Sequence, residues 1–529
     1  MILMRKAAHY QIADALTHMQ LPQMLQQHQA NRLFQLAILI IIASGLLLRA
    51  SKYLPAFSMR GDELAVTLNL IDRSAIELMM KPLDYEQAAP VGFVLIIKAL
   101  ITLLGASEYV LRLVAFLAGC ASLILMQNLL TKTVGRYGNL FALAAFAFGN
   151  YLIYYSAELK QYSTDVAMAL LLLLSFHQHL IKAATTRDFV LLAALGALAL
   201  CFSYPALFVL AAIGITLFLH YRRDRQRLLW ISLAGVLWGG TFLVMYFALL
   251  RHQTQDTYLI TFWDNLLSFM PMPPWQEPSW FPKALSGLFF VVAGLSSSLL
   301  LVIPLSLFGA WGFWRERRWQ WVLMLALPIG LNILASGFQK YPFHGRLILY
   351  LVPLVLIVLG KGIDVLLRLM PNRALAILVY ATLLVLLLKP WIATTNSYLF
   401  AHDYLRDDLK PALSFMEANK QDDDLVYLYH HAVQPYTYYA PAYHIEGLPV
   451  VTGQNNSADA RKYREELSFL PRGQRIWVLF SFVQNARVRK GVRRDERVYI
   501  LNYLRDHGTL LDEFYARNNA SSVHLFVLK

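Results

Sequence analysis

Long apolar runs recur along this chain from residue 33 to residue 392, and they constrain its fold more than any other feature. About 11 of them reach or approach the length of a membrane-spanning helix, because about 20 apolar residues cross the roughly 30 Å of hydrocarbon. Hydrophobic residues make up 57% of the chain and charged residues only 15%, whereas a soluble protein carries about a quarter of charged residues. The sequence therefore predicts an all-α polytopic membrane domain over residues 33–395. Its predicted spans cover residues 33–50, 109–130, 138–155, 164–181, 188–203, 205–220, 229–250, 284–312, 319–336, 347–367 and 374–392.

The run Val91–Leu104 is too short to be counted among these spans. It follows Pro90, has about 14 residues and contains Lys98, which fits an interfacial or re-entrant helix. Counting it as a span would move the basic loop near Arg222 out of the cytoplasm, against the tendency of such loops to stay inside. We therefore expect about 11 spans, interfacial helices in the first outer loop, and a cytoplasmic N-terminal segment over residues 1–32.

The same charge pattern predicts the side on which each loop lies. Segments 51–108, 154–164, 251–283 and 336–346, and everything after about residue 393, fall on the predicted outer side. The polar, Gln-rich start is followed by a run without a small-residue cleavage site, so the first span is predicted to be a retained signal anchor. These features predict a multi-pass protein of a bacterial inner membrane.

The C-terminal segment changes character near Asn396. Short apolar runs alternate there with helical patterns such as the one around Asp495–His507, which predicts a small periplasmic α/β domain over residues 396–529. The expected strands are Leu425–Tyr429, Val450–Val451, Ile476–Phe480 and Val523–Leu528.

The net charge of +14 lies almost wholly in the membrane part, because basic and acidic residues nearly balance after Asn396. Nucleic-acid binding is therefore not expected. Cys120 and Cys201 lie far apart inside apolar runs, so neither a disulfide nor a thiolate metal site is predicted. The histidines, His430 and His431 included, show no metal-binding spacing, and the sequence has no nucleotide-binding glycine motif. The sequence thus predicts no metal and no cofactor.

Asp62 and Glu63 stand together about ten residues after the first predicted span. If their loop faces a cavity, two adjacent carboxylates at a membrane surface are candidates for proton transfer. The alternative is a structural role, in which Asp62 caps a helix and Glu63 favours its first turn. A second polar cluster with Tyr85 and Gln87 precedes Pro90 and is typical of a surface turn.

Two further outer segments combine polar groups with aromatic ones. If a helix starts near Glu158, then Glu158, Tyr162 and Asp165 share one face and Lys160 points elsewhere. Such a stripe indicates a site, although a belt of interfacial tyrosines is an equally good reading. The 251–283 loop holds Trp263, Trp275 and Trp280, for which membrane anchoring is the simpler interpretation.

The outer loop 339–346 is the strongest basic cluster on its side. Lys340, His344 and Arg346 place three potential cations within seven residues. Arg346 can grip a phosphate through two parallel hydrogen bonds, and Lys340 can supply a point charge. The alternative is snorkelling of these side chains to lipid head groups.

Four stretches of this sequence resemble motifs of the GT-C glycosyltransferases, over roughly residues 33–370. They read RGDELAVTLN, YEQAAPVGFVLIIKALITLLGASEYVLRL, YYSAELKQY and KYPFHGRLILYLVP. The resemblance is to the lipid-phosphate-dependent type, which includes aminoarabinose transferases and protein O-mannosyltransferases. It implies that a sugar is transferred with inversion from a polyprenyl-phosphate donor to a lipid, glycan or protein acceptor outside the cytoplasm.

The resemblance also implies roles for individual residues. Asp62 would be the general base, and Glu63 would orient the acceptor or share that role. Arg346, with Lys340 and His344, would stabilise the departing lipid phosphate. The residues implied to line the substrate cavity are Glu158, Tyr162, Arg112, Tyr85 and Gln87.

The chain departs from both named activities in its motifs. It has Gln87-Ala88-Ala89-Pro90 where aminoarabinose transferases tend to carry Lys-Pro, and it lacks the Asp-x-His-Pro-Pro run of protein O-mannosyltransferases. The sugar and the acceptor therefore stay open. Two alternatives from other classes are a transporter or flippase of lipid-linked saccharides and a non-catalytic partner in envelope assembly.

Overall fold

The structure is a computed structural model that describes residues 31–181, 184–251, 257–295, 299–401, 408–489, 492–519 and 521–529. Most of the expected cytoplasmic segment 1–32 and the loop residue Lys182 lie outside these ranges. In the described part of the chain, five helices are long and apolar enough to span a membrane, or seven if each of two bent pairs is one span. The chain is thus a multi-pass membrane protein, and the number of about 11 spans stays a prediction.

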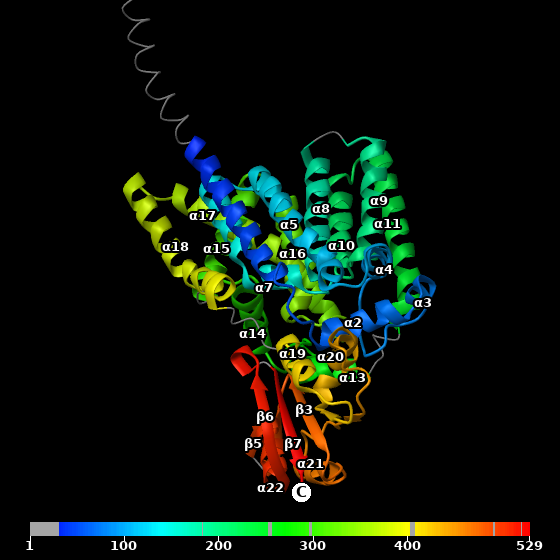
Figure 1. The fold of residues 1–529 in the computed structure, drawn as a ribbon. Coiled ribbons are helices and arrows are strands. Elements are labelled where there is room, and N and C mark those ends of the chain that lie inside the picture. Colours follow the sequence, from blue (N-terminus) through cyan, green and yellow to red (C-terminus); the bar gives the residue numbers. More distant parts are fainter. Residues whose placement is uncertain are drawn as a thin grey trace, which may run out of the picture.

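A bundle of helices forms the body of the molecule, and a smaller α/β unit lies at one end of it (Figure 1). Each predicted apolar run coincides with helical structure, but the run 284–312 is divided between two segments, Trp280–Val292 and α15. The bundle helices are Asn31–Tyr53, α5 (Glu108–Thr133), α6 (Arg136–Phe148), α7 (Asn150–Tyr154), α8 (Tyr162–Ile181), α9 (Thr186–Phe202), α10 (Ala206–His220), α11 (Arg225–Met245), α15 (Leu299–Arg315), α16 (Trp319–Gly337), α17 (Val352–Arg368) and α18 (Arg373–Asn396).

Shorter helices gather at the end of the bundle that carries the α/β unit (Figure 1). The first connection contributes α2 (Gly61–Asp72), α3 (Ala75–Met80) and α4 (Val91–Leu104), and the 251–283 loop contributes α13 (Thr257–Asn265) and the start of α14 (Trp280–Ser286). We call this end the site face. Short 3-10 or π segments continue several helices, at η1 (Tyr155–Ala157), η2 (Tyr246–Leu250), η3 (Gly287–Val292), η4 (Gly345–Leu351) and η5 (Ser397–Ala401).

The basic loops meet at the other end of the bundle, which we call the basic face. Arg318 Nη2 donates to the backbone oxygen of Lys132 at 3.1 Å, and Lys361 Nζ lies 2.6 Å from a carboxylate oxygen of Glu316. These contacts join the α5–α6, α15–α16 and α17–α18 regions. The separation of basic loops from the site face is the arrangement that the charge pattern predicted.

Helix α4 does not carry the chain from one face to the other. Tyr53 Oη donates to the backbone oxygen of Tyr109 at 2.8 Å, and Tyr109 Oη donates to that of Leu54 at 2.7 Å. The chain therefore leaves the first helix and enters α5 at the same place. With 14 residues, α4 is about 20 Å long, which is shorter than the hydrocarbon core. Both observations agree with the prediction that this run is not a span.

The C-terminal unit is built on a five-stranded mixed sheet in the order β2-β1-β3-β7-β6. Strand β1 pairs in parallel with β2 and β3, whereas β7 pairs antiparallel with β3 and β6. The elements are α19 (Lys410–Asn419), β1 (Leu425–Leu428), η6 (His430–Ala432), α20 (Val433–Tyr439), η7 (Ala440–Tyr443), β2 (Val450–Thr452), α21 (Arg461–Ser468), β3 (Arg475–Ser481), β4 (Asn485–Arg489), β5 (Val492–Asp495), α22 (Glu496–His507), β6 (Gly508–Tyr515), η8 (Arg517–Asn519) and β7 (Ser521–Leu528).

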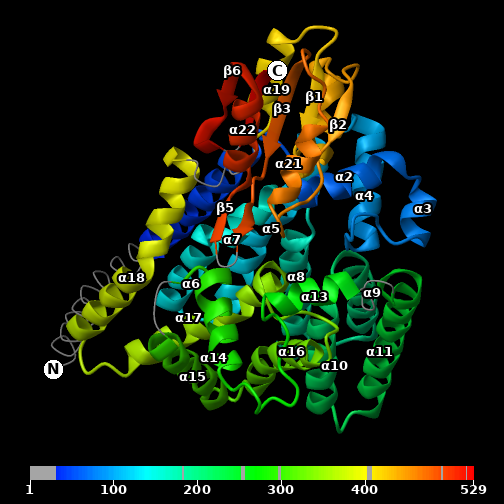
Figure 2. The same cartoon turned by 90° about the horizontal axis from the view of Figure 1, so that it is seen from below.

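The four predicted strands are β1, β2, β3 and β7, and the predicted helix is α22. This confirms a small C-terminal α/β unit. Seen from the site face, the unit lies beside α2 and α4 and leaves α13 and α14 in open view (Figure 2). One continuous core of buried side chains joins α2, α4 and the sheet, for example through Leu64, Phe93 and Val478.

Candidate functional site

A pocket of about 520 Å³ opens at the site face, where the ends of several bundle helices meet the short helices. Its size lies within the usual range of small-molecule sites. Three cations and two carboxylates line it, together with a wall of aromatic rings. The charged lining residues are Asp62, Glu86, Lys160, Lys340 and Arg346, and the aromatic ones are Tyr85, Tyr162, Tyr204, Phe208, Phe242, Tyr246, Phe262, Trp263, Phe269 and Tyr341.

Asp62 and Arg346 form an ion pair in this pocket. Arg346 Nη2 lies 2.6 Å from Asp62 Oδ2, and its guanidinium lies 5.5 Å from the centre of the Tyr162 ring. Asp62 comes from the first turn of α2, whose N-cap is Arg60 without a side-chain cap hydrogen bond. The capping role considered for Asp62 is therefore wrong, because α2 begins at Gly61 and Asp62 lies two positions after the N-cap residue Arg60.

Lys160 is the second cation close to Asp62, although the sequence had placed it elsewhere. The expected helix from Glu158 does not form, because α8 begins only at Tyr162 and Glu158 is extended. The buried Lys160 therefore reaches the pocket, where Nζ donates to Gln87 Oε1 at 2.5 Å. Burial lowers the pKa of Lys160 to about 8, although Asp62 opposes this shift.

The charge state of Asp62 reflects these two neighbours. Burial by itself would raise the pKa of the Asp62 carboxyl, but Lys160 and Arg346 outweigh that effect and hold the pKa below its ordinary value. The carboxylate is therefore ionised at neutral pH. It still presents about half of its side-chain surface to the pocket.

Glu63 points away from the pocket, into the protein. Its two carboxylate oxygens accept from Arg112 Nε and Nη2 at 2.8 and 2.7 Å, and one of them also accepts from the Leu159 backbone N–H at 2.7 Å. Burial would raise the pKa of Glu63, but Arg112 outweighs it and lowers the pKa to about 2. Only 1% of this residue is exposed, so Glu63 has no access to a substrate.

Two expected cavity residues belong to this buried charge cluster and not to the pocket. Arg112 pairs with Glu63, and Glu158 forms an ion pair with Lys52 of the first helix. In the described part of the chain neither Arg112 nor Glu158 is among the residues that line the pocket. Tyr85 and Gln87 do line it, as the resemblance had implied.

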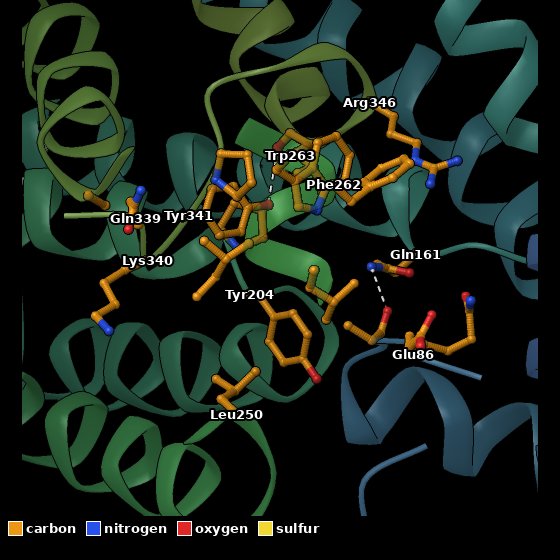
Figure 3. A pocket seen from close by; sticks show the side chains of 18 of the residues that line it. Glu86, Gln161, Tyr204, Leu250, Phe262, Trp263, Gln339, Lys340, Tyr341 and Arg346 are labelled. Atoms are coloured by element: carbon orange, nitrogen blue, oxygen red, sulfur yellow. Dashed lines mark hydrogen bonds between the residues drawn. The ribbon is translucent and has the colours of Figure 1, made fainter. Parts of the chain in front are cut away.

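The predicted basic cluster of loop 339–346 is split by the structure. In Figure 3, Lys340 and Arg346 lie at opposite ends of the pocket, with Tyr341 and Trp263 between them. They are thus not positioned to bind one and the same phosphate. Burial and the nearby Arg346 lower the pKa of His344, so its imidazole is uncharged at neutral pH and does not act as a third cation.

The 251–283 loop contributes more than the membrane anchoring expected of it. Helix α13 turns Phe262 and Trp263 into the pocket (Figure 3), while Trp275 is exposed and Trp280 is buried against the Leu267 backbone oxygen. A run of aromatic residues in a loop gives no signal that separates a pocket wall from an anchor. The position of α13 in the folded protein shows which aromatic residues of the loop line the pocket.

The fold and this site together define a multi-pass membrane protein with a ligand pocket that concentrates positive charge. A scan of protein-family models found no match to the sequence, and a search of curated proteins found none either.

Among solved structures, the chain is similar to ArnT from Cupriavidus metallidurans bound to undecaprenyl phosphate. The identity is 12% and the TM-score 0.46, over 92% of this chain and 97% of that one. It is also similar to an Archaeoglobus fulgidus oligosaccharyltransferase tethered to an acceptor peptide, with 11% identity, a TM-score of 0.45, and coverage of 84% and 69%. AglB from the same organism, in complex with an inhibitory peptide and a dolichol-phosphate, matches at 10% identity and a TM-score of 0.43, over 83% and 69%.

None of these three structures exceeds 12% identity or a TM-score of 0.46. At these levels of similarity no activity and no residue role is transferred to this chain. Its function is therefore argued from its own pocket.

Proposed function

We propose that this chain is a membrane glycosyltransferase that takes a sugar from a polyprenyl-phosphate donor and places it on an acceptor hydroxyl with inversion. The observation that carries this proposal is the contact of Asp62 with Arg346 in a pocket that also holds Lys160. Two cations suit a phosphate, and a carboxylate at the same place suits the removal of a proton from an acceptor.

Arg346 and Lys160 bind the donor phosphate in this proposal. The guanidinium of Arg346 offers two parallel hydrogen bonds, and Lys160 adds a charge that needs no fixed geometry. Both are largely withdrawn from solvent, so their charges act more strongly on the phosphate than they would in water. The pocket lies at the ends of apolar helices, from where a lipid-anchored phosphate can enter it.

Asp62 is the general base in this proposal, and donor binding prepares it for that role. In the free protein Lys160 and Arg346 hold the pKa of Asp62 low, which makes it a weak base. A phosphate that draws both cations toward itself weakens their hold on Asp62. The pKa of Asp62 then rises, and the carboxylate accepts a proton more readily when the donor is in place.

The chemical step is a single displacement at the anomeric carbon of the sugar. Asp62 takes the proton from the acceptor hydroxyl while the acceptor oxygen forms a bond to that carbon. The bond between the anomeric carbon and the phosphate oxygen breaks, and its electron pair stays on the phosphate. Polyprenyl phosphate leaves with one more negative charge than the donor carried, and Arg346 and Lys160 stabilise that charge.

The surroundings of Glu63 support Asp62 as the base. Glu63 already accepts hydrogen bonds from Arg112 and Leu159 and has no exposed face. We assign it the task of orienting the first turn of α2. The wider arrangement is also part of the proposal: a cytoplasmic segment over residues 1–32, a catalytic membrane domain over 33–395, and a periplasmic domain over 396–529 in a bacterial inner membrane.

The test is the exchange of Asp62 for asparagine. Purified Asp62→Asn protein should release no free polyprenyl phosphate from a labelled lipid-linked sugar in the presence of acceptor, although it remains folded in the membrane. Asp72→Asn is the matched control, because Asp72 lies exposed at the far end of the same helix. Unchanged transfer by Asp62→Asn would refute the assignment of the base.

The same assay separates the proposal from the two alternatives of other classes. A transporter of lipid-linked saccharides moves the donor without cleaving it, and an assembly partner leaves it untouched. Release of polyprenyl phosphate that depends on acceptor therefore supports a transferase. If the wild-type protein releases none with any acceptor fraction of the cell envelope, the proposed function is wrong.

A further inference from the structure

The backbone just before α2 is held by the C-terminal unit, which the mechanism above does not use. Ser58 Oγ donates to Asp408 Oδ1 at 2.7 Å and accepts from the Leu409 and Lys410 N–H groups at 3.0 and 3.1 Å. Lys410 Nζ in turn donates to the Ala56 backbone oxygen at 2.8 Å. Ser58 precedes Asp62 by four positions, so these bonds fix the segment from which the proposed base extends.

Tyr439 makes a further contact between the C-terminal unit and the segment before α2. Its hydroxyl accepts from the Met59 backbone N–H at 2.8 Å and donates to Glu108 Oε1 at 3.1 Å. Tyr439 is 3% exposed and Met59 is 1% exposed, so water has no access to replace these bonds. Helix α20, which carries Tyr439, lies beside α2 at the site face (Figure 1).

The same contact reaches the other side of α2 through α5. Glu108 stands in the first turn of α5 and also pairs with Lys410 at 2.5 Å. One turn further along α5, Arg112 binds the Glu63 carboxylate and donates to the Phe57 backbone oxygen at 2.8 Å. The start of α2 is therefore fixed from the C-terminal unit and from α5 together, with Tyr439 linking the two.

We propose that Tyr439 is a positioning residue through which the C-terminal unit sets the place of the Asp62 carboxylate in the pocket. This inference rests on the proposed function, because it concerns the base of that reaction. Tyr439 itself touches neither donor nor acceptor, since it is absent from the described residues that line the pocket. Its effect is carried by the backbone of residues 56–60.

A shift of the α2 start changes the chemical step more than it changes donor binding. Asp62 must lie within hydrogen-bond reach of the acceptor hydroxyl, and a displacement of about 1 Å costs up to about a hundredfold in rate. Arg346 and Lys160 belong to η4 and to the segment before α8. In the described part of the chain the polar and ring contacts of Tyr439 go to Met59, Glu108, Lys410 and Tyr438 and to neither of these two cations. The loss of the Tyr439 bonds should therefore lower kcat and leave donor affinity nearly unchanged.

The experiment compares Tyr439→Phe with Tyr438→Phe in the full-length protein. Tyr438 is a matched control, because its hydroxyl also joins the C-terminal unit to the bundle but donates to the Ala106 backbone oxygen at 2.9 Å and not to residues 56–59. We expect Tyr439→Phe to lower kcat about tenfold, with less than a twofold change in the KM for the donor. Tyr438→Phe should keep the wild-type kcat.

A second variant tests the other contact that holds this segment, between Ser58 and residues 408–410. Ser58→Ala removes the three bonds to residues 408–410 and leaves Tyr439 intact, so it should reproduce the fall in kcat even if Tyr439→Phe does not fold. Wild-type kcat in either folded variant would overturn the proposal. An equal fall in kcat for Tyr438→Phe would also overturn it, because both tyrosines would then only hold the C-terminal unit against the bundle.

Failure of this inference is distinguishable from failure of the proposed function. If the wild-type protein transfers sugar and Asp62→Asn does not, the function holds whatever Tyr439→Phe shows. If the wild-type protein and Asp62→Asn release the same amount of polyprenyl phosphate, the assignment of the base fails, and the role of Tyr439 as a positioning residue for Asp62 fails with it. If the wild-type protein releases none, the proposed function itself fails.

Discussion

Lys160 is the pocket cation whose charge depends most on pH, because burial lowers its pKa to about 8. A lysine with a lowered pKa carries its charge below that value and loses it above. We expect kcat/KM for the donor to fall as pH rises through about 8, since a neutral amine no longer attracts the phosphate. Asp62 stays ionised down to acidic pH, because its pKa lies below the ordinary value. No acidic limb from Asp62 should therefore appear near neutral pH.

The measurement is a pH profile of kcat/KM between pH 6 and 10 for the wild-type protein and for Lys160→Arg. The guanidinium stays charged throughout this range, so the alkaline fall should move to higher pH or vanish in the variant. An identical alkaline limb in both proteins would assign that limb to another group.

The neighbours Asp62 and Glu63 show where sequence reasoning stops at the residue scale. Successive residues of a helix differ by about 100° in direction, so one carboxylate faces the pocket and the other faces Arg112. The sequence predicts that an acidic pair is present but not how its helix is rotated. Lys160 was missed for a related reason, because a helical reading of residues 158–165 turned it away from the face of Tyr162.

At the scale of elements, Arg49 explains how the bundle tolerates a break between α6 and α7. These helices meet at 51° near Gly149. Arg49 Nη1 donates to the backbone oxygens of Gly45 and Ala147 at 2.9 and 3.2 Å, and Nη2 donates to that of Phe146 at 3.4 Å. The guanidinium thus satisfies carbonyl groups that the broken helix leaves without an intrahelical partner.

Replacement of Arg49 by leucine should therefore destabilise the protein by about 1–3 kcal/mol, because buried carbonyl groups lose their donors. The thermal midpoint of the detergent-solubilised protein, followed by the fluorescence of its tryptophans, measures the effect. Arg49→Gln keeps a donor at this position and should lose less. Equal stability of the wild-type and leucine proteins would mean that other groups satisfy these carbonyls.

The elements that the sequence predicts are those whose side chains all lie in the same kind of environment. A short apolar run such as Leu425–Leu428 predicts a buried strand, and the structure places β1 there with every residue buried. Strand β6 was not predicted, because it lies at the edge of the sheet and its residues are only half-buried or exposed, without a regular alternation. The run 284–312 is predicted as one span, because hydropathy alone does not show that it is divided between the helical segments Trp280–Val292 and Leu299–Arg315.

At the scale of the whole molecule, the charge pattern decided how the loops sort between the two faces. Basic residues such as Arg318 and Lys361 meet at one end of the bundle, and Asp62 and Arg346 meet at the other. The pocket itself could not be predicted from the sequence, because only the packed bundle brings its lining residues together. Among the segments that supply them are the first connection, α8, α10, α13 and η4. Which face lies outside the cytoplasm follows from the positive-inside rule and stays a prediction.

That orientation has a direct test with single cysteines. Cys120 and Cys201 are first replaced by alanine, and Asp422→Cys on the C-terminal unit or Arg223→Cys on the basic face is then introduced. Both positions are exposed. In intact bacterial spheroplasts a membrane-impermeant maleimide should label Asp422→Cys at once and Arg223→Cys only after the membrane is opened. The reverse pattern would place the pocket in the cytoplasm, where an acceptor outside the membrane has no access to Asp62.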